Sequence, residues 1–261
     1  MARPVSASTV MPSRAMAPDV LLNFDVATPT LIAARSLQER VDRKYVLGAG
    51  TLEPLLAHLC HEYSLLRAGE QDWARYESIY LDTPGLDLYH AHRCGRRPRH
   101  KIRIRHHVER QLSFLEIKSK TNSGRTVKRR LPLPYGQNHL GAAERQFIEN
   151  YAPVDAVRLM PCITISFMRL TLVGRGLNER LTFDRDLTCA GGPREGRFSR
   201  VVIAEVKQAQ YSNHLGAVAA LRSLHAREAA FSKYCVGTVL VAPVAGNIFK
   251  PTLRAVERLS A

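Results

Sequence analysis

Basic residues recur at every second position in neighbouring segments of this chain, at a spacing that suits the binding of a polyanion. Successive side chains of a β-strand point to opposite faces, so the four cations among residues 99–105 share one face, and Ile102 and Ile104 take the other. Residues 114–120 and 127–131 repeat the alternation. These segments form a predicted meander whose cationic face carries the candidate anion-binding residues Lys101, Arg103, Arg105, Lys118 and Lys128.

Like charges on adjacent strands make such a face costly unless something neutralises it. Two unit charges about 4 Å apart repel by about 4 kcal/mol at an effective dielectric constant near 20. The structural alternative is an ordinary solvated face, since half-buried antiparallel strands alternate apolar and polar residues. The uniform charge of the meander instead favours a bound polyanion, whose negative charge would turn the repulsion into a driving force for binding.

The charge of the whole chain points to the same class of partner. Its 261 residues include 38 Lys and Arg against 23 Asp and Glu, for a formal net charge of +15, and this balance favours phosphate-rich ligands. Nucleic acid, polyphosphate, nucleotides and acidic membranes all fit. Proteins that bind single-stranded nucleic acid stack its bases on aromatic side chains, but residues 97–130 offer only Phe114. We therefore expect no nucleic-acid partner.

Cysteine use and hydropathy bound the location of the protein. The five cysteines are scattered and never form a CxxC pair, which disfavours a disulfide framework or a thiol metal site and fits a reducing, cytoplasmic compartment. No apolar run approaches the roughly 18 to 20 residues that span a bilayer. We therefore expect no transmembrane segment, and the question of a membrane-protein partner stays open.

An antiparallel sheet is needed to bring the basic side chains together. Outside the meander, alternating or apolar runs predict strands at residues 36–47, 75–82, 162–173, 178–187 and 200–208. Helical spacing predicts a helix that follows Thr51, with Thr51 as its N-cap residue. It predicts a second helix over residues 140–151. About eight strands in sequence indicate an α+β fold, an antiparallel eight-stranded β-barrel with a polar lumen and with flanking helices on its apolar outer side. We expect a flexible tail over residues 1–35, a barrel domain over 36–245 and a C-terminal helical extension over 246–261.

Strands outside the meander add charged residues to the predicted lumen. Alternation places Lys44, Arg169 and Arg180 there, and it sets Lys207 beside Glu205. The acidic members among these cations are Glu205 and, in the meander, Glu116. Small divalent cations are typically held by one or two carboxylates together with substrate phosphates. Each glutamate is therefore either a metal ligand or an ion-pair partner of a neighbouring cation.

Other polar side chains receive no role in this chemistry. Tyr45 and Tyr80 are expected to pack in the core. His106 and His107 lack the spacing of metal ligands and are expected to be exposed. Asp186 is expected on the same strand face as Arg180 and Asp184, because the three stand at even spacing. The sequence contains no Gly-rich P-loop, no GxGxxG motif and no internal repeat.

A series of short motifs links these residues to a known family. The motifs are Asp42-Arg-Lys-Tyr45, Ser78-Ile-Tyr-Leu-Asp-Thr83, Tyr89 followed by Gly95, Lys101-x-Arg-x-Arg105, Phe114-Leu-Glu-x-Lys118, Gly124-Arg-Thr-x-Lys128, Arg180-x-Thr-x-Asp184, Glu205-x-Lys207 and Ser232-Lys-Tyr234. In this order they resemble the VTC (vacuolar transporter chaperone) polyphosphate polymerase domain, which belongs to the triphosphate tunnel metalloenzyme, or CYTH-like, group. The resemblance covers about residues 36–240.

The resemblance implies a β-barrel tunnel that binds the triphosphate of ATP and passes its terminal phosphoryl group to a growing polyphosphate chain. The implied partners are then ATP and polyphosphate. The implied cofactor is Mn²⁺ or Mg²⁺, with Glu205 as the main metal ligand and Glu116 as a secondary one. The implied catalytic residues, which hold phosphates, are Arg103, Arg105, Lys118, Lys128, Arg169 and Arg180. The implied substrate-binding residues are Lys44, Lys101, Lys207, Ser232 and Lys233, of which the last two would close the substrate end.

Two other functions remain open from the residues alone. Phosphoryl transfer has a loose transition state that positioning and charge stabilise, so water could replace the acceptor and give a metal-dependent triphosphatase of the same fold. A non-catalytic polyanion-binding module is the second alternative.

The chain departs from the family pattern at two positions. At Asp42 bacterial members usually have Glu, and at Ala230 many have a basic residue that would grip one phosphate.

Overall fold

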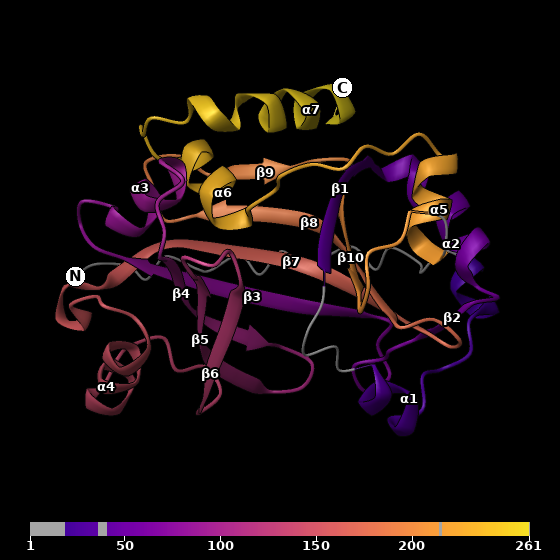
Figure 1. Ribbon diagram of the computed structural model, residues 1–261, viewed down its shortest axis with the longest axis horizontal. Helices are drawn as coiled ribbons and strands as arrows, with labels where there is room; N and C mark the ends of the chain where they lie inside the picture. Colours follow the sequence, from indigo (N-terminus) through magenta and orange to yellow (C-terminus); the bar gives the residue numbers. More distant parts are fainter. Residues whose placement is uncertain (1–18, 36–40, 214–215, 261) are drawn as a thin grey trace, which may run out of the picture.

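One antiparallel sheet runs through the protein and carries helices on its faces (Figure 1). The computed structural model describes residues 19–35, 41–213 and 216–260. Within these ranges the sheet has ten strands, in the order β1-β10-β8-β7-β3-β4-β5-β6, with β2 paired to β7 and β9 to β8. The strands are β1 Val41–Gly48, β2 Tyr63–Leu65, β3 Trp73–Asp82, β4 Arg99–His107, β5 Leu112–Lys120, β6 Thr126–Leu133, β7 Met160–Gly174, β8 Glu179–Ala190, β9 Gly196–Phe198 and β10 Val201–Gln208.

Helices precede, interrupt and follow the strands. The α-helices are α1 Pro29–Ala34, α2 Leu52–Leu59, α3 Asp87–Arg93, α4 Ala142–Tyr151, α5 Gly216–Ser223, α6 Lys233–Val241 and α7 Lys250–Ser260. The 3₁₀ helices are η1 Asp19–Asn23, η2 Ala49–Thr51, η3 Ala156–Arg158 and η4 Asn247–Phe249. Among the described residues, no helix is long and apolar enough to cross a membrane. All five cysteines are unpaired.

The sheet curls so that one of its faces turns inward. Strands β1 and β6 stand at its two ends, and within the described ranges no ladder joins them. Side chains instead come close to each other across this seam. Lys118 Nζ of β5 lies 3.8 Å from Asp42 Oδ2 of β1. The predicted α+β fold with an antiparallel sheet is confirmed, and the sheet is open at the seam between β1 and β6.

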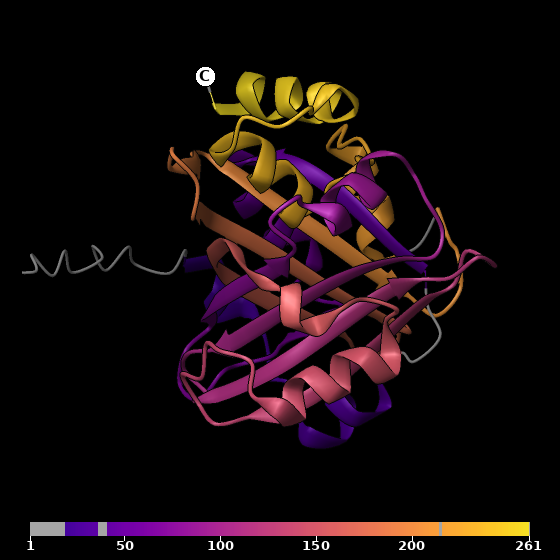
Figure 2. The ribbon, with the colours of Figure 1, turned by 90° about the vertical axis from the view of Figure 1, so that its left-hand side faces the viewer.

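Hydrophobic packing holds helices against both faces of the sheet. On the outer face, α2 and α5 pack through Leu55 and Leu221 against β1, β10, β8 and β7. Helix α4 packs through Ile148 against the outer face of β3, β4 and β5. Helix α6 instead lies on the inward face, where Tyr234 and Val236 join the apolar residues at one end of β7, β8 and β10. Figure 2 shows α6 and α7 on one side of the sheet and α4 on the other. The charged part of the inward face therefore begins beside the first residue of α6, Lys233, which donates to Asp184.

Two short strands and the N-terminal segment differ from the sequence-based expectation. Strands β2 and β9 have three residues each, too few to show a clear alternation. Residues 19–35, assigned to the tail, contain η1 and α1, and Val20 and Phe24 are buried in the cluster around α2. The folded region thus starts before residue 36. Residues 36–40 of the first predicted strand lie outside the described residues.

Helix α2 begins without the expected side-chain cap. Thr51 already has helical backbone angles (φ −80°, ψ −17°), and its side chain makes no capping hydrogen bond. The 3₁₀ helix η2 runs directly into α2, so the chain enters the helix through a preceding turn rather than through a capping hydroxyl. At the other end of the chain, the expected C-terminal extension contains η4 and α7, and Val256 of α7 is buried.

Candidate functional site

The strand register places three lysines side by side on the inward face. Lys101 of β4 stands opposite Lys118 of β5, and Lys118 stands opposite Lys128 of β6. We call these three residues the lysine row. Like charges directly opposite each other destabilise a sheet. The lysine row is therefore a place where a bound anion would relieve repulsion that the fold itself creates.

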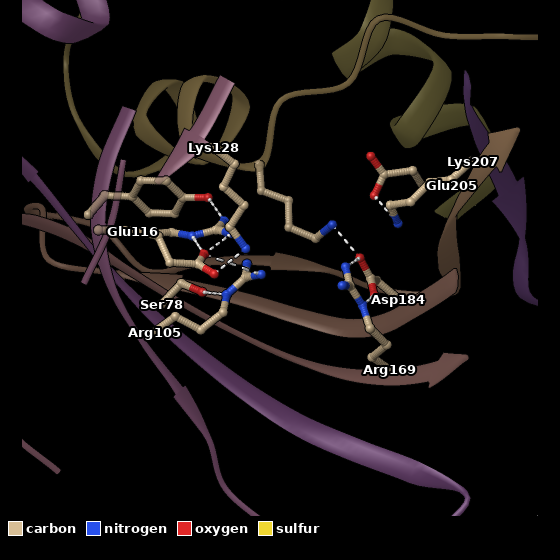
Figure 3. Close-up of polar contacts among 11 residues, drawn as sticks. Ser78, Arg105, Glu116, Lys128, Arg169, Asp184, Glu205 and Lys207 are labelled. Atoms are coloured by element: carbon tan, nitrogen blue, oxygen red, sulfur yellow. Dashed lines mark hydrogen bonds and ion pairs between the residues drawn. The ribbon is translucent and has the colours of Figure 1, made fainter. Parts of the chain in front are cut away.

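Glu116 gathers the cations next to the lysine row. Its Oε2 accepts hydrogen bonds from Arg103 Nη2 at 2.5 Å and from Arg103 Nε at 2.8 Å, and its Oε1 pairs with Lys128 Nζ (Figure 3). Arg105 Nη1 lies 3.9 Å from the same Oε2, and Arg105 Nε donates to Ser78 Oγ at 3.0 Å. Burial opposes the negative charge, but Arg103, Arg105 and Lys128 outweigh it and hold the pKa of Glu116 well below its ordinary value. Cations thus engage both carboxylate oxygens.

Asp184 of β8 is a second buried carboxylate that binds more than one cation. Arg169 forms a two-point contact with it, through Nε to Oδ1 at 2.6 Å and through Nη2 to Oδ2 at 2.7 Å. Lys233, the first residue of α6, also donates to Oδ2. Burial opposes ionisation of Asp184, but Arg169 and Lys233 hold its pKa below the ordinary value. Two-point arginine contacts fix direction as well as distance, so this carboxylate orients Arg169.

A third charged group lies on β1, β10 and β8. Lys207 Nζ is 3.2 Å from Glu205 Oε2. Lys44 stands opposite Glu205 in the β1–β10 ladder, and its Nζ donates to the Phe231 carbonyl oxygen at 2.9 Å. Arg180 stands opposite Lys207. Burial raises the pKa of Glu205, but Lys207 and Lys44 outweigh this effect and hold the pKa well below its ordinary value. Glu205 is therefore an ionised carboxylate among cations.

The start of α6 is tied to the lysine row. Ser232 caps the helix, since its Oγ accepts the Cys235 backbone N–H at 3.3 Å. The same oxygen accepts a hydrogen bond from Lys101 Nζ at 2.9 Å. With Lys233 on Asp184 and the Phe231 carbonyl oxygen on Lys44, this segment connects α6 to the charged groups of the inward face.

Crowding and burial weaken the hold of several lysines on their protons. Burial, together with Lys44, lowers the pKa of Lys101 to about 8. Burial lowers the pKa of Lys128 to about 8 although Glu116 is close. Burial also lowers the pKa values of Lys118, Lys207 and Lys233. A bound phosphate would favour the protonated forms, because its charge offsets both the burial and the repulsion.

The donor set for a divalent metal is sparse. Within the described residues, no group of three or more His, Cys, Asp and Glu side chains is arranged to hold a metal ion. A metal here would take most of its ligands from substrate phosphates, which is how Mg²⁺ is commonly held. Of the two glutamates, Glu116 has both oxygens engaged by cations, which matches the ion-pair alternative. Glu205 fits a metal better, because its ion pair with Lys207 uses only Oε2.

The structure gathers the predicted site residues on the inward face and at the adjoining start of α6. The face carries cations and carboxylates from most of the strands around the seam. The residues placed there are Lys44, Lys101, Arg103, Arg105, Glu116, Lys118, Lys128, Arg169, Arg180, Glu205 and Lys207, and Ser232 and Lys233 adjoin them.

Two contacts went unassigned in the sequence. Asp184 binds Arg169, a partner from another strand that spacing alone does not indicate. Tyr80 is buried, as predicted, yet its hydroxyl also accepts a hydrogen bond from Arg103 Nη1 at 2.9 Å. Its alternation with Ser78 was the available signal, because the two residues share one face of β3. They stand opposite Arg105 and Arg103 of the basic strand β4.

Two predictions about this region are wrong. His106 is buried, and its Nδ1 is hydrogen-bonded with Ser113 Oγ at 2.7 Å, because it points to the outer face of β4. Asp186 does not continue the face of Asp184. Its backbone has a φ of 54°, and the β7–β8 register shifts nearby. Its side chain is 59% exposed and lies beside Arg185.

A curled antiparallel sheet with cations from many strands on its inward face is the arrangement that the resemblance to the VTC domain implied. The chain belongs to the VTC domain family, whose model matches residues 39–242. The match spans all the strands of the sheet and the whole of α6. A comparison with curated proteins finds no match.

Solved structures with a similar fold include proposed nucleotide cyclases. A proposed adenylate cyclase from Bacillus halodurans has 14% identity and a TM-score of 0.49, over 74% of this chain and 93% of that one. One from Vibrio parahaemolyticus has 13% identity and a TM-score of 0.45, over 76% and 98%. A proposed adenylyl cyclase from Hippeastrum, described as having a dominant triphosphatase activity, has 12% identity and a TM-score of 0.47, over 77% and 96%.

Proposed function

We propose that this protein is an ATP-dependent polyphosphate polymerase that transfers the terminal phosphoryl group of ATP to a growing polyphosphate chain. The observation that carries the proposal is the lysine row, Lys101, Lys118 and Lys128, set beside Arg103 and Arg105 on one inward face. A linear triphosphate carries charged oxygens along its length, and ammonium and guanidinium groups in series match it. Membership of the VTC domain family supports the same assignment.

The residues have distinct roles in this proposal. Positioning and electrostatic stabilisation supply most of the catalysis in phosphoryl transfer, so no side-chain nucleophile is needed. Lys44, Lys101, Lys207, Ser232 and Lys233 would contact the substrate. The groups that would hold phosphates are Arg103, Arg105, Lys118, Lys128, Arg169 and Arg180.

Mn²⁺ or Mg²⁺ is the cofactor that fits the proposed reaction. When bound, it would neutralise charge that develops on phosphate oxygens. Glu205 is the residue that would hold it, because its depressed pKa keeps the carboxylate ionised and a single lysine pairs with Oε2. Glu116 would instead orient Arg103 and Lys128, which already occupy its two oxygens.

Incubation of the purified protein with ATP and Mn²⁺ tests the activity. Long polyphosphate chains on a gel are the expected product. Release of free phosphate without chains would replace the proposal with a triphosphatase. Binding of ATP and polyphosphate with no turnover under any metal would leave only a polyanion-binding module.

The substitution Glu205→Ala tests the metal assignment. We expect it to abolish metal-dependent turnover while metal-free binding of ATP is retained, because it removes a carboxylate and leaves the cations in place. Glu149→Ala, at an exposed position on α4, is the matched control and should keep full activity. Unchanged turnover in Glu205→Ala would refute the metal assignment.

A further inference from the structure

One end of the inward face continues into a surface rich in arginine. Beyond Lys101 and Lys118, the next pair on the same face is Arg99 opposite Lys120. Two connections border this pair, the loop at residues 94–98 and the β5–β6 hairpin at 121–125. We define the arginine rim as Arg96, Arg97, Arg99, Lys120 and Arg125.

The rim is cationic with no acidic residue near it in sequence. No Asp or Glu occurs between Asp87 and Glu109, or between Glu116 and Glu144. At the opposite end of the strands, the charges of the connections are balanced. The β4–β5 connection contains both acidic and basic residues, and Arg175 after β7 pairs with Asp25 at 2.5 Å. The positive surface is therefore concentrated at one end of the face.

Neutral partners hold Arg99 in place, so its charge is not cancelled. Its Nε donates to His92 Nδ1 at 3.1 Å, and its Nη1 donates to the carbonyl oxygens of Gly95 at 3.3 Å and Arg96 at 3.0 Å. Burial and the nearby Lys101 lower the pKa of His92 to about 3, so the ring stays uncharged. Arg99 is thus oriented by three neutral acceptors and keeps its full attraction for an anion.

The two connections form one continuous surface. Gly124 has a φ of +79°, and a Cβ at that position would lie 3.4 Å from Arg97 Nη1. Arg97 therefore packs directly over the hairpin. The hairpin is itself closed by backbone hydrogen bonds from Thr121 N to Arg125 O and from Gly124 N to Thr121 O, at 2.9 and 3.0 Å. Arg96, Arg97 and Arg125 are all exposed on this surface.

We propose that the arginine rim binds the part of a polyphosphate chain that extends beyond the lysine row, and so retains the chain between successive transfers. This inference rests on the proposed function for the choice of chain. The rim continues the same strand face as the lysine row, so one linear polyanion can follow both. An acidic membrane fits less well, since surfaces that bind membranes usually insert apolar or aromatic side chains and residues 94–98 and 121–125 contain no Trp, Tyr, Phe, Leu, Ile, Val or Met.

Binding of long-chain polyphosphate, of tripolyphosphate and of phosphatidylserine vesicles, without ATP or metal, tests the proposal. The rim variant is the triple substitution Arg96→Gln, Arg97→Gln and Arg125→Gln. The matched control removes three exposed arginines of α4 and α7 through Arg145→Gln, Arg254→Gln and Arg258→Gln. Both variants lose the same net charge, and thermal unfolding of each checks that the fold is kept.

We expect the rim variant to bind long chains about tenfold or more weakly and to bind tripolyphosphate normally. The slope of log affinity against log salt should fall by about 2, because each lost contact with a flexible polyanion removes about 0.7 of a released counterion. The control should change neither value. Equal losses for both ligands, or for both variants, would overturn the proposal. So would a rim variant that loses binding only to phosphatidylserine vesicles, since this result assigns the rim to a membrane.

The outcome is separable from that of the proposed function. A protein that makes no polyphosphate, but whose rim variant loses long-chain affinity selectively, fails as a polymerase and keeps the rim site. A protein that makes polyphosphate, but whose rim variant binds long chains normally, keeps its function and loses the rim site.

Discussion

Binding of ATP should take up protons near pH 8, because Lys101 and Lys128 of the lysine row have pKa values of about 8 and are partly deprotonated at that pH. The pKa of Lys101 is about 8, lowered by burial and by Lys44 from an ordinary value of 10.5. Lys118 also lowers it, whereas Cys235 and Tyr80 act in the opposite direction. A bound phosphate supplies the missing negative charge and raises the pKa again.

The size of the effect follows from the two pKa values. We take it that phosphate restores the pKa of Lys101 from about 8 to its ordinary value. The affinity for ATP is then nearly constant below about pH 8 and falls as the pH rises above about 8. Between about pH 7 and about pH 9 the loss is about tenfold for this lysine alone. The ligand adds little, since a phosphate monoester has already lost its last proton above about pH 6.

Isothermal titration calorimetry of ATP without metal, in buffers of different ionisation enthalpy, counts the protons directly. Lys101→Arg keeps the positive charge but does not titrate in this range, so it should remove the share of the proton uptake that Lys101 contributes. Because the pKa of Lys128 is also about 8, the double substitution Lys101→Arg and Lys128→Arg should remove most of the uptake. Equal uptake in the wild type and the double variant would refute the reasoning.

Two further substitutions test the contacts that orient the arginines. Asp184→Asn should lower the free energy of unfolding by about 3 kcal/mol in urea titrations, because it leaves Arg169 and Lys233 without their buried carboxylate. The depressed pKa of Asp184 means that its contribution is complete at neutral pH and is lost in acid, so the variant and the wild type should converge at low pH. Tyr80→Phe should weaken ATP binding about tenfold with little change in melting temperature, because Arg103 loses one acceptor; unchanged affinity would contradict this role.

Strand alternation explains how much of the site could be predicted from the sequence. Lys101, Arg103 and Arg105 had to share a face once β4 was a strand, because the side-chain period of a strand is two. The same rule placed Glu116 beside Lys118 on β5. The residues on each face of a single strand, and hence the charge of the inward face, follow from local order alone.

Contacts between distant strands could not be predicted in the same way. The pairing of Arg169 with Asp184 depends on the β7–β8 register, which shifts near Met168. A shift of one residue in register moves side chains to the opposite face, which is why Asp186 was misplaced. The burial of Val20 and Phe24 likewise depends on α2, whose apolar face receives them. Such partners are chosen by packing in three dimensions.

The carboxylates on the inward face hold its arginines more tightly than they hold Lys101 and Lys118. Arg103 and Arg169 are each fixed by an ionised carboxylate at 2.5 to 2.8 Å, so their charges are partly offset and their directions are set before any substrate arrives. Lys128 also pairs with Glu116, but the other two members of the lysine row are held less tightly. Lys101 donates to the hydroxyl of Ser232, and Lys118 is 3.8 Å from Asp42. We therefore expect a phosphate to gain most of its attraction from Lys101 and Lys118, while the arginines, already oriented, would determine where its oxygens lie.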